Sequence, residues 1–141
     1  MDGGLLAMRP DGEVNTAWRR AGTVFVTHQD ASDEESVGTG EQPWVATNSN
    51  GTYIVWTSKR EGELLLAKIE SHVPEKISDN ARDFVIVAVD GSKPFVQVFW
   101  EVRSWQLKSH YGAYERIESL SRRTLPLRIA ALLFPVHRIA R

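Results

Sequence analysis

The sequence predicts an all-β chain built from antiparallel sheets, and two observations carry this prediction. The apolar residues in residues 1–119 mostly alternate with polar ones or form short continuous runs, a spacing that is typical of strands and not of helices. Asp-Gly or Asn-Gly pairs at positions 11–12, 50–51 and 90–91 separate these runs. Such pairs accept the positive φ angles that tight hairpins require.

The same pattern recurs three times along the chain. In each copy an apolar run leads through one of these turns into a β-rich strand that ends in tryptophan, and a second turn leads into another apolar run. Trp18, Trp56 and Trp100 mark the copies about forty residues apart, which is the spacing of a repeated sheet unit. The copies read LLAM-RPDG-EVNTAW-RRAG-TVFVTHQ, WVAT-NSNG-TYIVW-TSKREG-ELLLAKIE and FVIVAV-DGSKP-FVQVFW-EVRS-WQLKSHY.

Each copy therefore predicts three antiparallel strands, and the copies differ in the segment after the third strand. Residues 74–78 and 114–119 are expected to form a fourth, outer strand in the second and third copies, whereas the acidic stretch 30–35 replaces it in the first. Four such strands make one blade of a β-propeller, so residues 1–119 predict a partial propeller of about three blades, or half a ring. The alternative is a single β-sandwich, which explains the alternation and the turns but not the recurring tryptophan.

The composition is that of an ordinary folded domain. The 141 residues are 42% hydrophobic and 25% charged, with a formal net charge of −1, which gives no reason to expect a nucleic acid partner. The chain has no cysteine, and its four histidines lack metal-ligand spacing, so we expect no metal and no cofactor. Residues 120–141 contain five arginines and no acid. We expect this segment to be a poorly ordered or short helical extension that does not contact a membrane.

Three segments resemble the sialidase-like β-propeller superfamily, namely GEVNTAWRRAGTVFVTHQD, GEQPWVATNSNGTYIVWTSKREGELLLAK and PFVQVFWE. The resemblance covers residues 5–119 and rests on a rhythm of turn, apolar strand, tryptophan, basic residue, turn and apolar strand. It implies a six-bladed propeller of which this chain supplies about half. The diagnostic motifs of the family, Ser-x-Asp-x-Gly-x-x-Trp and aromatic-Arg-Ile-Pro, do not occur in the sequence. No catalytic residue can therefore be carried over.

The resemblance implies a non-catalytic, sialidase-like propeller fragment that acts as an interaction or glycan-binding scaffold. The alternative is an exo-sialidase-type glycoside hydrolase that needs additional blades for activity. We expect no signal peptide in this chain, and the family pattern would place a full-length protein outside the cytoplasm. Three blades would leave two apolar sheet faces uncovered, so we expect the chain to associate with itself.

Basic residues follow each repeat tryptophan, and the candidates at equivalent positions are Arg20, Lys59 or Arg60, and Arg103. Equivalent blade positions converge around a propeller axis, where repeated guanidinium groups would bind the carboxylate of an acidic sugar. The alternative is that the three arginines keep exposed hairpins soluble. Trp44 and Trp105 lie outside the tryptophan repeat. We expect both to pack between blades, whereas exposed indoles would instead stack on sugar rings.

Overall fold

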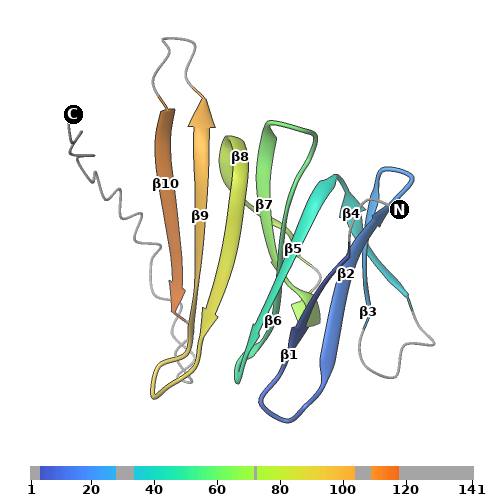
Figure 1. Cartoon of the computed structure of the whole chain (residues 1–141), viewed down its shortest axis with the longest axis vertical. Helices are drawn as coiled ribbons and strands as arrows, with labels where there is room; N and C mark the ends of the chain where they lie inside the picture. Colours follow the sequence, from blue (N-terminus) through green and yellow to red (C-terminus); the bar gives the residue numbers. More distant parts are fainter. Residues whose placement is uncertain (1–3, 28–33, 72, 104–108, 118–141) are drawn as a thin grey trace, which may run out of the picture.

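The computed structural model describes residues 4–27, 34–71, 73–103 and 109–117 (Figure 1). Within these residues the chain forms ten β-strands and one short 3-10 helix, η1 (Ile69–Ser71). All paired strands run antiparallel, so the all-β prediction is confirmed. The predicted extension, residues 120–141, lies outside the described residues. The strands are β1 (Gly4–Met8), β2 (Val14–Arg20), β3 (Thr23–Thr27), β4 (Glu35–Thr39), β5 (Glu41–Asn48), β6 (Gly51–Thr57), β7 (Gly62–Lys68), β8 (Glu75–Val89), β9 (Phe95–Arg103) and β10 (Ser109–Ile117).

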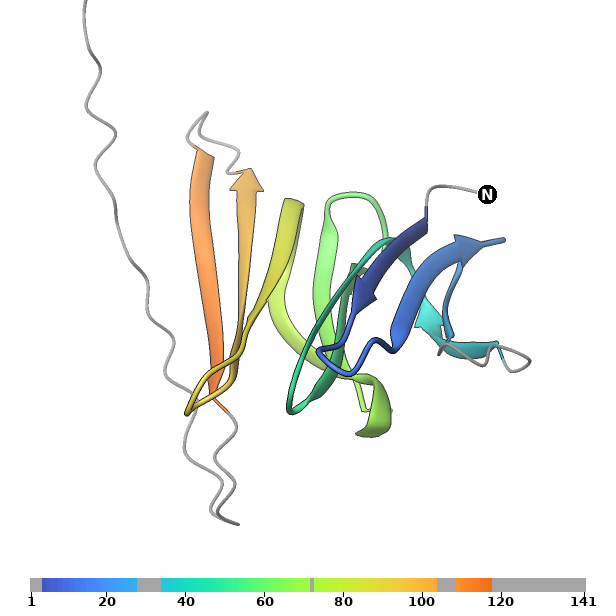
Figure 2. The same cartoon turned by 60° about the horizontal axis from the view of Figure 1, so that its bottom comes forward.

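The strands form two sheets, which contain three repeated units. β1–β4 make a four-stranded sheet, and β5–β10 make a six-stranded sheet in consecutive order. The long strand β8 pairs with β7 up to Ala81 and with β9 from Arg82 onward. We therefore call β1–β4 module 1, and β5–β7 with residues 75–81 of β8 module 2. Module 3 consists of residues 82–89 of β8 with β9 and β10. Figure 2 shows the modules side by side, from blue module 1 to orange β10.

The modules correspond to the three copies of the sequence repeat, and their agreement with propeller blades is partial. Module 1 is a four-stranded meander, as a blade would be. The expectation that residues 30–35 replace its outer strand is wrong, because β4 begins at Glu35 and pairs with β3. The outer strand predicted at 74–78 lies in the first part of β8. Modules 2 and 3 share β8, so they are not separate sheets.

Module 3 differs from the prediction at its end. The sequence predicts a third strand ending near residue 110 and an outer strand at 114–119. The structure instead has the single strand β10, which pairs with β9 from Ser109 to Ile117. The two predicted segments are one continuous strand because β9 is long enough to pair with both of them.

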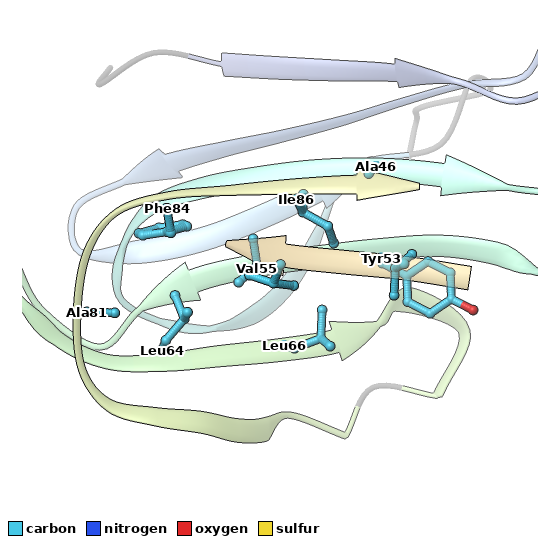
Figure 3. Packing of buried hydrophobic residues seen from close by; sticks show 10 residues of the cluster. Ala46, Tyr53, Val55, Leu64, Leu66, Ala81, Phe84 and Ile86 are labelled. Carbon is cyan, nitrogen blue, oxygen red and sulfur yellow. The ribbon is translucent and has the colours of Figure 1, made fainter. Parts of the chain in front are cut away.

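Module 2 lies between the other two modules and is covered on both faces. One apolar cluster, the module 1–2 core, joins it to β2 and β3. A second cluster, the module 2–3 core, joins its opposite face to β8 and β9 (Figure 3). The module 1–2 core contains Ala17, Val24, Val26, Val45, Ile54, Trp56, Ala67 and Ile69. The module 2–3 core contains Ala46, Tyr53, Val55, Leu64, Leu66, Ala81, Phe84, Ile86, Val96 and Val98.

Strand β6 shows this three-layer arrangement most clearly. Every residue from Gly51 to Thr57 is buried. Successive side chains of a strand point to opposite faces, and accordingly Ile54 belongs to the module 1–2 core while Val55 belongs to the module 2–3 core. A two-layer sandwich leaves one face of each sheet open, so the sandwich alternative does not describe this molecule.

The repeat tryptophans occupy equivalent strands. Trp18, Trp56 and Trp100 lie on β2, β6 and β9, the second strand of each module. Trp56 is buried in the core toward module 1, and Trp100 packs against the core toward module 2. Trp18 stacks on Phe25, with 5.9 Å between the ring centroids. The sequence repeat is thus also a repeat in three dimensions.

The first strands of the three modules lie next to one another, as inner strands do around a propeller axis. β1 is in contact with β5, and β5 is in contact with β8. Only Gly40 separates the outer strand β4 from β5, and β8 passes from module 2 into module 3 without a break. The chain therefore passes directly from the outer strand of each module into the first strand of the next.

Polar contacts fasten modules 2 and 3 where the β5–β6 and β8–β9 hairpins meet. The buried Asn48 side chain donates hydrogen bonds to the carbonyl oxygens of Phe95, at 3.1 Å, and Val89, at 3.4 Å. The Ser49 N–H donates to the Asp90 carboxylate at 2.7 Å. This backbone hydrogen bond favours the charged carboxylate and lowers the pKa of Asp90.

Asn15 provides a test of the module 1–2 core. It is fully buried on the face of β2 that also carries Ala17, and its side-chain amide forms no hydrogen bond with the described residues. Replacing Asn15 with leucine should therefore raise the free energy of unfolding, by about 1–3 kcal/mol, because an unpaired buried amide carries a desolvation cost. Urea denaturation measures this change.

Asn48→Leu is the matched control for that experiment. Asn48 is also buried, but its amide is hydrogen-bonded to two carbonyl groups of module 3. The same substitution should therefore lower stability at this position. Equal destabilisation by Asn15→Leu and Asn48→Leu would contradict the described packing of Asn15.

Candidate functional site

A small cavity lies between the first strand of module 2 and the first strand of module 3. It has a volume of about 200 Å³, and its lining residues are Gln42 and Trp44 from β5 with Asp83 and Phe84 from β8. The β6–β7 hairpin is close by, because Glu61 of that hairpin forms an ion pair with Arg82, at 3.9 Å. The cavity thus lies where two first strands approach each other.

The backbone of both strands is irregular at the cavity. Gln42 has a φ of 53° and Asp83 a φ of 46°, values that are uncommon for residues other than glycine. The strand pairing also shifts register at both places, between Glu41 and Trp44 in β5 and between Arg82 and Val85 in β8. Such bulges redirect side chains, and strained backbone of this kind often accompanies binding sites.

Trp44 gives the cavity an accessible aromatic wall. Its relative exposure is 37%, whereas Trp56 of the neighbouring strand is buried. Trp44 lies between modules 2 and 3, as predicted, but it is more exposed than the prediction of a packed indole requires. The bulge at the start of β5 turns this part of the strand away from regular pairing and leaves the indole partly open. Trp105, for which the same packing is predicted, lies outside the described residues.

The charged groups beside the cavity form ion pairs. Arg82 donates a hydrogen bond to Glu101 at 2.8 Å, and this bond raises the pKa of the guanidinium. The Asp83 carboxylate lies 3.8 Å from the same guanidinium group. On the other side, Arg19 lies 3.8 Å from Glu41. Arg82, the cation next to Asp83 in the chain, is therefore already matched by carboxylates.

The three arginines predicted from the sequence occupy the corresponding parts of the modules. Arg20 ends β2 and Arg103 ends β9, while Arg60 is exposed in the β6–β7 hairpin. The ends of β2 and β9 and the β6–β7 hairpin lie toward the upper end in Figure 1. The Arg20 guanidinium bonds the Glu34 carboxylate, at 2.9 Å from Nη1, and lies 4.5 Å above the Phe25 ring. The Arg103 side chain lies outside the described part. The common anion site stays a prediction.

Sequence reasoning missed Gln42, Asp83 and Phe84. Their signal in the sequence is weak: in Gln42-Pro43-Trp44 and Asp83-Phe84-Val85 a polar residue precedes the apolar part of a module's first strand. The chemistry available at the cavity is that of one carboxylate, one amide and one indole. This set can accept and donate hydrogen bonds around a ring that stacks on the indole.

Among the residues that the structure describes, no group of three or more His, Asp or Glu side chains is arranged to hold a metal ion. No helix in this described part is long and apolar enough to cross a membrane. A scan against protein-family models and searches of curated proteins and of solved structures found no match for this chain.

Proposed function

We propose that this chain is a non-catalytic binding scaffold that holds a neutral sugar ring in the Gln42–Trp44–Asp83 cavity. The observation that carries the proposal is the partly exposed Trp44 indole beside two polar side chains on strained backbone. An indole presents a flat apolar face, which suits the C–H face of a sugar. Carboxylate and amide groups at its edge suit the hydroxyl groups.

The size of the cavity limits the ligand. About 200 Å³ is below the range of roughly 300–1,000 Å³ that is usual for ligand pockets, so a single ring is favoured over an extended chain. One stacking contact and a few hydrogen bonds give modest affinity. We expect a dissociation constant on the order of 1 mM, which corresponds to about 4 kcal/mol.

The charges favour a neutral sugar over an acidic one. A sugar carboxylate needs an available guanidinium or ammonium group, and Arg82 beside the cavity is already paired with Glu101. Asp83 would also repel an anionic ligand. The non-catalytic character is supported by the cavity lining, because Asp83 is the single carboxylate among the four described residues that line it. Glycosidases commonly use two carboxyl groups that flank the scissile bond. The alternative function, a sialidase-type hydrolase, is supported only by the sequence resemblance.

Replacing Trp44 with alanine should weaken binding of a neutral hexose at least about tenfold, because the stacking surface is lost. Binding is measured by following the amide resonances of the labelled chain while neutral hexoses and, separately, sialic acid are added. Trp44→Phe should retain part of the affinity, because a smaller ring remains. The unfolding midpoint of each variant shows that the fold is intact.

Arg60→Ala is the control that separates the two kinds of ligand. It removes an exposed cation of the β6–β7 hairpin and should leave binding of a neutral hexose unchanged. Binding of sialic acid that survives Trp44→Ala and is lost in Arg60→Ala would contradict the proposal. That result would favour the anion site formed by the hairpin arginines.

A further inference from the structure

The repeat tryptophans establish a direction along the stack of modules. Trp56 of module 2 faces module 1, and Trp100 of module 3 faces module 2. We call the face of a module that carries its repeat tryptophan the rear face, and the opposite face the front face. In both contacts within the chain, the rear face of one module packs on the front face of the module before it.

The rear face of module 1 is the first one left without a partner. Ala17 belongs to the module 1–2 core, so its neighbour Trp18 lies on the opposite face of β2. Leu5 packs against the same core, which places the adjacent Leu6 on the rear face, where it is 69% exposed. Met8 is also exposed on this face, and Phe25 stacks on Trp18 there. The rear face of module 1 therefore carries an apolar patch, with the Arg20 guanidinium over the Phe25 ring at its edge.

The front face of module 3 is apolar as well. Phe84 and Ile86 belong to the module 2–3 core, so Val85 and Val87 point the other way along β8. Phe99 is the strand partner of Val85 and is 42% exposed, and Val87 is also exposed. Beyond this face the described residues contain no further module. This front face of module 3 corresponds to the front face of module 2, which carries Tyr53 and Val55 and is covered by module 3.

We propose that a second copy of this chain covers both open faces, with the rear face of module 1 in each copy packed on the front face of module 3 in the other. Two such contacts, related by a twofold axis, close a ring of six modules. A second copy is the expected partner because its contacts would continue those that already join the modules inside the chain. There the same pairing of a rear face with a front face already occurs twice, each time with a buried apolar core.

The two contacts inside the chain also share a polar feature that makes the pairing specific. Arg19 of module 1 forms an ion pair with Glu41 of module 2, at 3.8 Å. Glu61 of module 2 forms one with Arg82 of module 3, at 3.9 Å. Each contact therefore combines an apolar centre with a charged pair at its edge, as specific interfaces do. A second copy presents the same kinds of apolar face that meet inside the chain, whereas an unrelated protein would need a surface of matching shape and chemistry.

Sedimentation velocity of the full chain over a range of concentrations tests this proposal. We expect a species of twice the mass of one chain, in reversible equilibrium with the monomer. Leu6→Lys and Phe99→Glu should each shift this equilibrium toward the monomer by at least about tenfold in the dissociation constant, because each places a charge in an apolar contact. Both side chains are exposed in the single chain, so the fold should be retained. Val73→Glu, at an exposed valine between η1 and β8, should leave the dimer unchanged.

Mixing the two variants tests which faces meet. In a mixed dimer the lysine introduced at position 6 of one copy would face the glutamate introduced at position 99 of the other. The second contact would be unaltered, so an equimolar mixture of Leu6→Lys and Phe99→Glu should recover the dimer. A chain that stays monomeric at all concentrations would overturn the proposal, and so would open-ended oligomers larger than the dimer. A mixture that stays monomeric would also overturn it, because the proposed pairing leaves one contact of the mixed dimer unaltered and brings opposite charges together at the other.

Discussion

Replacing Trp56 with alanine should lower the free energy of unfolding by about 3–5 kcal/mol, the usual cost of truncating a buried tryptophan. Trp56 is almost completely buried in the module 1–2 core, and its indole N–H donates to the Thr39 carbonyl oxygen at 3.2 Å. The substitution therefore leaves both a cavity and an unpaired carbonyl group. Because whole domains are stable by only about 5–15 kcal/mol, much of the fold's stability would be lost. Urea denaturation followed by circular dichroism gives the value.

Trp44→Ala is the matched control for this prediction. It makes the same chemical change one strand away, but on a side chain that is already partly exposed. Its effect on stability should be about 1 kcal/mol or less, which is typical of surface substitutions. Similar losses for Trp44→Ala and Trp56→Ala would mean that β6 is not covered on its module 1 side.

Replacing Gly40 with alanine should destabilise the chain by about 3 kcal/mol, the upper end of the usual cost of overpacking. Gly40 is buried between β4 and β5, and its N–H donates to the Gly22 carbonyl oxygen at 2.9 Å. A Cβ atom at this position would lie 2.4 Å from the Thr57 carbonyl oxygen and 2.4 Å from the Trp56 ring. The backbone oxygen cannot move without breaking the pairing of β6, so the passage from module 1 into module 2 must distort.

Gly12→Ala separates this steric effect from the general cost of losing a glycine. Gly12 has a φ of 90° in the β1–β2 hairpin, and a Cβ atom there would meet no atom within 4 Å. Its substitution should cost about 1 kcal/mol through backbone strain alone. Thermal unfolding of both variants provides the comparison. A smaller loss for Gly40→Ala than for Gly12→Ala would contradict the close contact between modules 1 and 2.

Much of the fold could be predicted because the first three strands of modules 1 and 2 each carry a local signal, whereas β4 was not predicted. Alternating or β-branched runs and the turns at Asp11-Gly12 and Asn50-Gly51 define β1–β3 and β5–β7. The continuity of β8 could not be predicted. Its change of partner between Ala81 and Arg82 needs no glycine or proline, since Asp83 itself adopts the positive φ. The sharing of one strand by two modules is therefore a product of the packing around it.

The candidate site is much harder to predict from the sequence than the fold. Basic residues after each tryptophan pointed to Arg20, Arg60 and Arg103, whereas the cavity depends on Gln42 and Asp83. Glutamine has no strong preference for the left-handed region, so its φ of 53° cannot be inferred from residue type. The exposure of Trp44 likewise follows from a bulge in β5, whereas the large apolar area of an indole predicts burial. A site that depends on local irregularities of the backbone is not indicated by a repeated sequence pattern.

The central claim is that β6 lies between two other layers, with module 1 on one face and module 3 on the other. Nuclear Overhauser contacts from β6 side chains in a methyl-labelled sample measure this directly. We predict cross-peaks from Ile54 to the valine methyl groups of β3, and from Val55 to methyl groups of β8 and β9 in the same sample. Cross-peaks on one face of β6 only, with the other face open to solvent, would contradict it.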